Sequence, residues 1–93
     1  MRYSIEEVIR ANKAAGYHFF DRDTMEFFGC KIVSPVFENC CFVTEEDDFL
    51  RTQRLYTVRQ FDPLTGSVET VGEFQEYGTI EEAIRAALEV RNV

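Results

Sequence analysis

The sequence lacks the patterns on which most small enzymes and metal sites depend. It has no tryptophan, one histidine (His18) and no glycine-rich phosphate loop, and no motif pairs a nucleophile with a base. Its three cysteines, Cys30, Cys40 and Cys41, form no Cys-x-x-Cys pair, so a zinc site would lack its four ligands. We therefore expect no catalytic residue, no metal and no cofactor, and we interpret the protein as a non-enzyme.

Long apolar runs are also missing. None approaches the roughly 20 residues that a membrane-spanning helix requires, and the N-terminal MRYSIEEVIR carries acids where a signal peptide would be apolar. An odd number of cysteines without a secretory signal argues against a disulfide framework. These features predict a cytoplasmic protein whose three thiols are buried for packing.

Positive charge is absent from two long stretches. Residues 38–50 contain five acids and residues 62–84 contain six, with no Lys or Arg in either, so the stretches carry −11 and the remaining residues +4 of a net −7. This layout disfavours direct binding to nucleic acid and favours a partner with a basic surface. The alternative is charge that serves only solubility. The predicted partner-binding residues are Glu45, Glu46, Asp47, Asp48, Glu69, Glu73, Glu76, Glu81 and Glu82.

The strongest structural pattern is a β-hairpin. Residues 55–61 and 67–74 are rich in strand-forming residues. Between them, Asp62 and Pro63 suit the first two positions of a type I turn, and Gly66 suits the left-handed conformation that returns the chain to a strand.

The rest of the chain predicts helices and short strands around this hairpin. Capping boxes at Ser4 and Thr79 indicate helices over 4–15 and 79–91, and a short helix is expected over 21–28. Strands are expected over 30–33 and 36–44, with a tight turn between 33 and 40 as the alternative, and residues 45–54 form an acidic loop. We predict a single α+β domain over 1–93, an antiparallel sheet of three or four strands with three helices packed on it. The expected core residues are Ile9, Phe20, Phe28, Val58, Phe74, Ile84 and Leu88.

Three segments together resemble a known group of proteins. HFFDRDTMEFFGCKI (18–32), LYTVRQFDPLTGSVETVGEF (55–74) and TIEEAIRAAL (79–88) are similar to a family of small uncharacterised proteins of bacteriophages and bacterial mobile elements. No activity is assigned to that family, so no functional residue is carried over. The resemblance implies a protein of the kind that inhibits host defence, such as an anti-CRISPR protein.

Two functional hypotheses follow from the charge and the resemblance. The first is a non-catalytic acidic protein that inhibits a host nucleic-acid-binding complex by occupying its basic surface. The second is an accessory protein-interaction module of phage or plasmid maintenance that binds through its sheet edge or exposed aromatics, without nucleic-acid mimicry. The first predicts that reversing residues 45–48 to Lys abolishes binding and leaves the melting temperature nearly unchanged.

Overall fold

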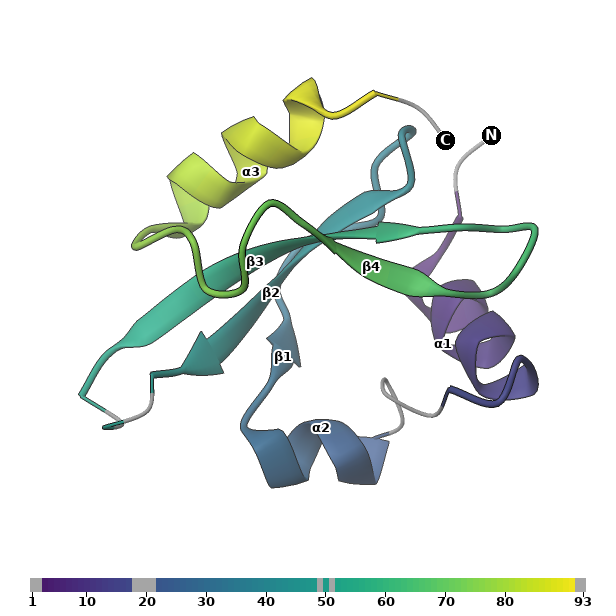
Figure 1. The fold of residues 1–93 in the computed structure, drawn as a ribbon, viewed down its shortest axis with the longest axis horizontal. Helices are drawn as coiled ribbons and strands as arrows, with labels where there is room; N and C mark the ends of the chain where they lie inside the picture. The colour runs from purple at the N-terminus through teal and green to yellow at the C-terminus, as the bar shows by residue number, and fades with distance from the viewer. Residues whose placement is uncertain (1–2, 18–21, 49, 51, 92–93) are drawn as a thin grey trace.

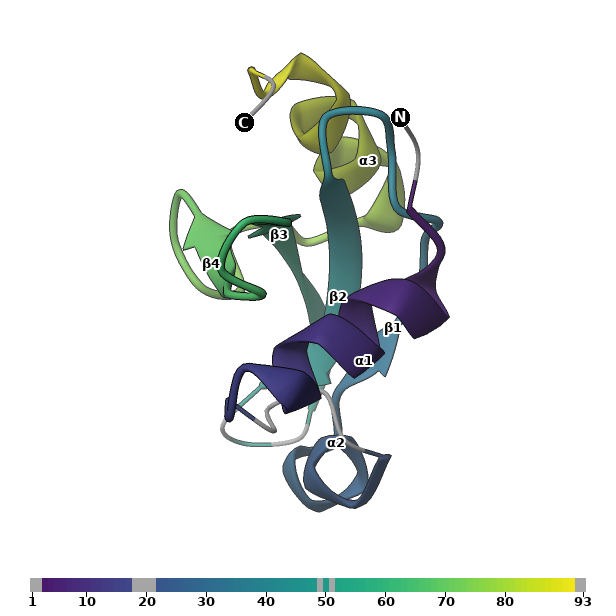
Figure 2. The same ribbon diagram turned by 90° about the vertical axis from the view of Figure 1, so that its right-hand side faces the viewer.

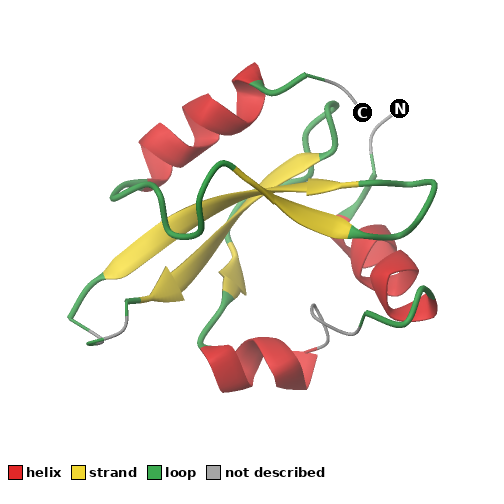
Figure 3. Cartoon of the chain, viewed as in Figure 1, coloured by secondary structure: helices red, strands yellow, loops and turns green. Residues whose placement is uncertain are grey.

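Four strands form one antiparallel sheet, and three helices surround it (Figures 1 and 3). The computed structural model describes residues 3–17, 22–48, 50 and 52–91, without the side chains of residues 22, 27 and 28. The order of strands across the sheet follows the chain, β1-β2-β3-β4. The elements are α1 (Ile5–Ala14), α2 (Arg22–Phe28), β1 (Lys31–Ile32), β2 (Cys41–Asp47), β3 (Arg54–Phe61), β4 (Val68–Val71) and α3 (Ile80–Glu89). The predicted α+β fold is confirmed.

Both long helices begin at the residues that the capping patterns indicate. The Ser4 hydroxyl accepts a hydrogen bond from the Glu7 amide at 3.2 Å, and the Glu7 carboxylate accepts one from the Ser4 amide at 3.1 Å. At α3, the Thr79 hydroxyl accepts from the Glu82 amide at 3.3 Å. These bonds satisfy amides that would otherwise lack partners in the first turn of each helix.

The β3–β4 hairpin forms as predicted, although its second strand is shorter. Phe61 pairs with Val68 and Val58 with Val71, and the chain leaves the strand at Gly72. In the turn, the Gly66 amide donates to the Asp62 carbonyl at 2.8 Å, and Gly66 has a φ of +76°. The left-handed conformation favours glycine at this position, because a side chain there would be strained.

The predicted strand over 36–44 is confirmed for residues 41–44 and wrong for residues 36–40. The chain turns between β1 and β2, where the Cys40 amide donates to the Phe37 carbonyl at 2.9 Å and Cys40 has a φ of +67°. Strand β2 begins only at Cys41. The alternative of a tight turn between residues 33 and 40 therefore describes this segment better.

The sheet has a different helix on each face. Along β2, Phe42 packs in a cluster with Val8 of α1, whereas the next residue, Val43, packs in a second cluster with Ala83 and Ala87 of α3. Successive side chains of a strand point to opposite faces, so the two helices cover opposite faces of the sheet. Figures 1 and 2 show α1 and α3 on different sides of the strands, with α2 at the end where β1 begins.

Asn39 connects the last turn of α3 to the sheet through hydrogen bonds. This residue was not identified from the sequence. Its side-chain amide donates to the Ala87 carbonyl at 2.7 Å and to the Val90 carbonyl at 2.8 Å, and its oxygen accepts from the Cys41 amide at 3.0 Å. Carbonyls at a helix C-terminus lack partners within the helix. One buried side chain therefore closes α3 and orders the start of β2.

The predicted core is partly wrong. Val58 is buried and Ile9 and Ile84 are half-buried, but Phe74 and Leu88 are 57% and 59% exposed. Phe74 lies beyond the end of β4, so the strand alternation no longer applies to it. The buried stripe of α3 centres on Ala83 and Ala87, which leaves Leu88 outside it. Phe20 and the Phe28 side chain lie outside the described residues.

Among the helices that the structure describes, none is long and apolar enough to cross a membrane.

Candidate partner-binding surface

Part of the acidic segment that we expected to be a loop is strand. Residues 45–47 belong to β2, which pairs with β3 through Glu45↔Tyr56, Glu46↔Leu55 and Asp47↔Arg54. Because strand side chains alternate, Glu46 points to the face opposite that of its two neighbours. The loop predicted over 45–54 is therefore wrong for residues 45–47 and for Arg54, which begins β3, and the four acids do not form one surface.

Glu46 lies inside the protein. It is 4% exposed, and its carboxylate accepts hydrogen bonds from the hydroxyls of Thr44 at 2.7 Å and Thr57 at 2.8 Å. The guanidinium of Arg59 lies 3.4 Å from the same carboxylate. A charge removed from water requires such partners, and here they are supplied by β2 and β3. Glu46 is consequently a structural carboxylate that no partner can reach.

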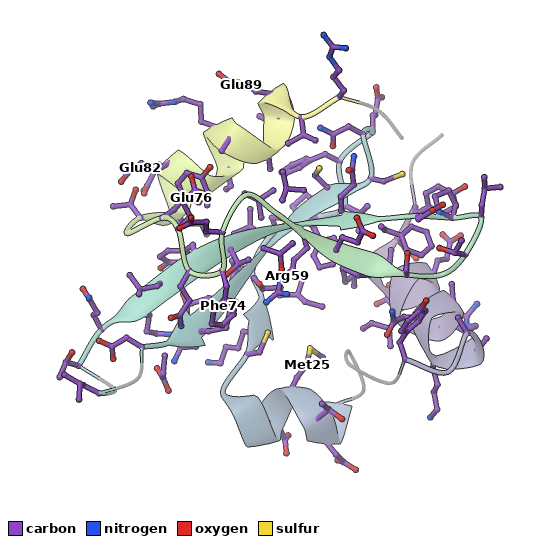
Figure 4. The ribbon with its side chains drawn as sticks, in the orientation of Figure 1. Met25, Arg59, Phe74, Glu76, Glu82 and Glu89 are labelled. Carbon is purple, nitrogen blue, oxygen red and sulfur yellow. The ribbon has the colours of Figure 1, made fainter. Side chains whose placement is uncertain are left out.

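A short segment after β4 covers Arg59. Phe74 lies over the guanidinium, 5.6 Å from carbon to ring centroid, which is the geometry of a cation–π contact (Figure 4). The Gln75 amide donates to the Thr57 hydroxyl at 2.8 Å. Gln75 has a φ of +57°, and this bond helps to hold that uncommon backbone. Phe74 is thus fixed in place while more than half of its surface faces solvent.

Two further acids of the first stretch pair with a base. The Arg54 guanidinium binds the carboxylate of Glu45 through Nε and that of Asp47 through Nη1, the latter at 2.7 Å, and it donates to the Gly29 carbonyl at 3.3 Å. Asp48 accepts hydrogen bonds from the amide and the hydroxyl of Thr52, both at 2.8 Å. Most of the charge in residues 38–50 is therefore engaged within the molecule.

The second acidic stretch stays at the surface. Glu69 is exposed on β4, Glu73 and Glu76 are exposed in the segment that follows, and Glu81 and Glu82 are exposed in the first turn of α3. Figure 4 shows Glu76 and Glu82 near the start of α3, with Glu89 at its far end. Glu89 was missed because Arg85 interrupts the base-free stretch. Its spacing of seven residues from Glu82, about two helical turns, is the signal that places both on one side of α3.

Two tyrosines show that carboxylates gather on this side of the sheet. Partial burial raises the pKa of Tyr77, and the charges of Glu76, Glu89 and Glu82 raise it further. A hydrogen bond to the Glu45 carboxylate, burial and the charge of Glu45 raise the pKa of Tyr56, whereas the charge of Arg54 opposes the shift and the charge of Glu81 makes a smaller contribution to it. Nearby negative charge disfavours ionisation of a phenol.

We name the surface around Tyr56 and Tyr77 the α3 acidic surface. Its carboxylates belong to Glu45, Glu76, Glu81, Glu82 and Glu89. One acid of the first stretch therefore joins the second stretch here. No group of three or more metal-binding side chains occurs in the described part of the chain.

Comparison of the sequence with known proteins assigns the chain to one family. A family sequence model described as "Family of unknown function (DUF7447)" matches residues 4–88. The chain belongs to the DUF7447 family. No curated protein and no solved structure matches it. The DUF7447 match spans α1, the sheet and nearly all of α3, and its description carries no activity, ligand or source.

The three thiols of this DUF7447 protein are free and buried. Burial raises the pKa of Cys30 to about 11, with the charge of Glu46 contributing, and burial likewise raises the pKa of Cys41 to about 11. Reactive thiols have lowered pKa values, because the thiolate is the nucleophile. At neutral pH both groups are therefore protonated and act as small apolar side chains.

These raised pKa values predict a loss of stability in alkali. Unfolding returns each thiol to a pKa near 9.0, so the unfolded chain loses its protons first as the pH rises. The stability is fully present below pH 9 and declines up to pH 11, by about 2–3 kcal/mol for each thiol. Urea unfolding at intervals from pH 8 to pH 11 measures this decline. A Cys30→Ala/Cys41→Ala variant should show a clearly smaller decline, and an equal decline in both proteins would contradict the assignment.

Proposed function

We propose that this protein is a non-catalytic binding protein whose α3 acidic surface occupies a basic surface of a partner protein or ribonucleoprotein. One observation carries the proposal. Carboxylates from two stretches far apart in the sequence meet around Tyr56 and Tyr77, where Glu45 also pairs with Arg54, whereas Glu46 is paired with Arg59 inside the fold. Charge that served only solubility would require no such gathering.

Electrostatics explains why a basic partner suits this surface. Carboxylates of like charge repel one another, and the charges of nearby glutamates contribute to the raised pKa values of both tyrosines, after burial for Tyr77 and after the hydrogen bond to Glu45 for Tyr56. Arginine and lysine side chains of a partner would relieve this repulsion and form charge-assisted hydrogen bonds with the carboxylates. Complementary charge also accelerates encounter, so association should be fast and should slow with added salt.

The partner class that we favour is a nucleic-acid-binding complex of a bacterial cell. A basic groove of such a complex normally holds phosphates, and the carboxylates around Tyr56 and Tyr77 present charge of the same sign. In this proposal the protein acts as a stoichiometric inhibitor, in the manner of an anti-CRISPR protein. The support is the acidic surface together with the resemblance to proteins of phages and mobile elements.

A second candidate function rests on exposed apolar side chains. Phe74 and Leu88 are more than half exposed, and Phe74 is held rigidly over Arg59. Rigid exposed aromatics are frequent anchors in protein interfaces. An accessory module that binds through such anchors would depend less on charge than an inhibitor that occupies a phosphate-binding groove.

Capture from a bacterial extract separates the two candidates. The wild-type protein is immobilised, a nuclease-treated extract is applied, and the retained proteins are identified by mass spectrometry. We expect basic nucleic-acid-binding proteins that are released by added duplex DNA and by salt of about 0.5 M, since exposed charges are then screened. Retained proteins that resist both treatments would contradict the acidic-surface proposal and favour the apolar module.

A further inference from the structure

A cavity opens between α1 and the β3–β4 turn. Its volume is about 400 Å³, and its apolar walls come from Tyr3, Ala11, Ala14, Phe61 and Pro63. Glu7 and Arg10, one acid and one base, complete the lining from α1. Glu7, Arg10 and Ala14 are exposed, so the cavity is open to solvent along the helix.

Beside this cavity an apolar side chain projects into water. Leu64 follows the wall residue Pro63 at the tip of the turn and is 92% exposed, more than Phe74 or Leu88. Its backbone is fixed, because the Leu64 amide donates to the Asp62 carboxylate at 2.9 Å. A rigid turn that exposes a leucine loses little conformational freedom when that leucine is buried by a partner.

The turn itself is anchored to α1. The side-chain amide of Asn12 donates to the Gly66 carbonyl at 3.0 Å, and Asn12 is 2% exposed. A methyl group added to Gly66 would lie 2.7 Å from the Ala11 carbonyl oxygen, so the turn and the helix are in close backbone contact. The cavity and Leu64 are therefore parts of one rigid surface.

We propose that a second copy of this chain covers the surface, with Leu64 of each copy inserted into the cavity of the other. A two-fold dimer requires a patch that is complementary to itself, and an apolar projection next to an apolar cavity meets that requirement. The charges fit as well. In a two-fold arrangement with antiparallel α1 helices and the axis between Glu7 and Arg10, Glu7 of one copy would face Arg10 of the other, and each acid would meet a base.

The overall charge supports the choice of this face. The protein carries −7, so two copies repel each other in most orientations. Helix α1 carries Arg10 and Lys13 as well as Glu6 and Glu7, which makes its surface nearly balanced. Helix α1 and the β3–β4 turn, whose residues line the cavity, lie at the opposite end of the sheet from the start of α3 (Figure 1), so the dimer leaves both α3 acidic surfaces accessible.

Sedimentation velocity tests the dimer without any knowledge of the partner. We expect the wild type to shift from monomer to dimer as its concentration rises from about 5 to about 500 µM, a range that covers weak, specific association. Leu64→Asp should weaken dimerisation by about tenfold or more, because it places a charge in the apolar cavity. Arg10→Glu should also weaken it, because two acids would then face two acids.

Leu88→Asp is the matched control. It makes the same chemical change at another exposed leucine, on α3, and should leave the dimer intact. Thermal melts of all variants test whether each variant is folded. A wild type that stays monomeric at the highest concentration would overturn the proposal, and so would equal dimerisation of the Leu64→Asp and Leu88→Asp proteins.

Discussion

Replacement of Glu46 by alanine is expected to lower the free energy of unfolding by about 3–5 kcal/mol, because it leaves the partner cation buried without this carboxylate. The side chains of Glu46 and Arg59 are 5% and 8% exposed, and the nearest nitrogen and oxygen are 3.4 Å apart. Two hydroxyl groups, those of Thr44 and Thr57, also lose their acceptor. Unpaired buried donors add to the penalty. For a domain with a total stability of roughly 5–15 kcal/mol, such a loss approaches complete unfolding.

A double-mutant cycle assigns this effect to the pair. Urea unfolding is measured for Glu46→Leu, for Arg59→Met and for the double variant. Buried ion pairs are often replaced by apolar side chains of similar volume at little cost, so the double variant should recover much of the stability lost in either single variant. Losses below about 1 kcal/mol in both single variants would show that this pair is not buried as described.

The burial of Glu46 also changes what we expect when residues 45–48 are reversed to Lys. Reversal of residues 45–48 to Lys was predicted to leave the melting temperature nearly unchanged. The structure shows that the reversal would place a lysine beside the buried Arg59 and break both pairs of Arg54. That variant should unfold, so it cannot serve as a test of binding.

The second large effect is expected at Phe61. Truncation of Phe61 to alanine should cost about 3–5 kcal/mol, the usual range for a buried phenylalanine. Phe61 is 2% exposed, packs with Val8 and Phe42, and meets the Tyr3 ring edge-on at a centroid distance of 5.4 Å. The loss therefore removes contacts between α1 and the sheet.

Phe74→Ala is the matched control for Phe61→Ala. Phe74 is 57% exposed, and its principal described contact is with Arg59. A cation–π contact with a desolvated cation such as Arg59 contributes about 2 kcal/mol, so this variant should lose less stability than Phe61→Ala. The denaturant midpoints of the two variants measure these two losses of stability. Equal losses would mean that Phe74 belongs to the core after all.

The sequence predicted those elements whose signals are local. The caps at Ser4 and Thr79 and the turn from Asp62 to Gly66 each depend on residues a few positions apart, and all three appear where expected. Such signals act through nearby backbone groups, so they survive without knowledge of the tertiary structure.

Strand β2 could not be placed in this way. Glu45, Glu46 and Asp47 have low strand propensity, but they continue the pairing of β2 with β3, where Arg54 and Arg59 provide partners across the sheet. That pairing depends on the register between two strands, which the sequence pattern left open. Without that register, the sequence could not indicate that Glu46 is buried or that Phe74 is exposed.

The acidic surface was predicted in part. Glu76, Glu81 and Glu82 were identified from the base-free stretch, and Glu45 joins them through the fold. Glu89 was missed, and Glu46 was included although it is buried. A count of charge along the chain therefore finds acidic segments but cannot separate carboxylates that face solvent from those that balance a buried arginine.

The central proposal is that the α3 acidic surface, and not total negative charge, binds the partner. The most direct test compares two variants that lose the same charge, Glu82→Gln/Glu89→Gln on α3 and Glu6→Gln/Asp23→Asn on the exposed surfaces of α1 and α2. Extract proteins retained by each immobilised variant are quantified against the wild type at one salt concentration. The account predicts that the α3 variant loses about tenfold or more of the retained partner and that the other variant retains it nearly unchanged. Equal retention by the two variants would contradict the account.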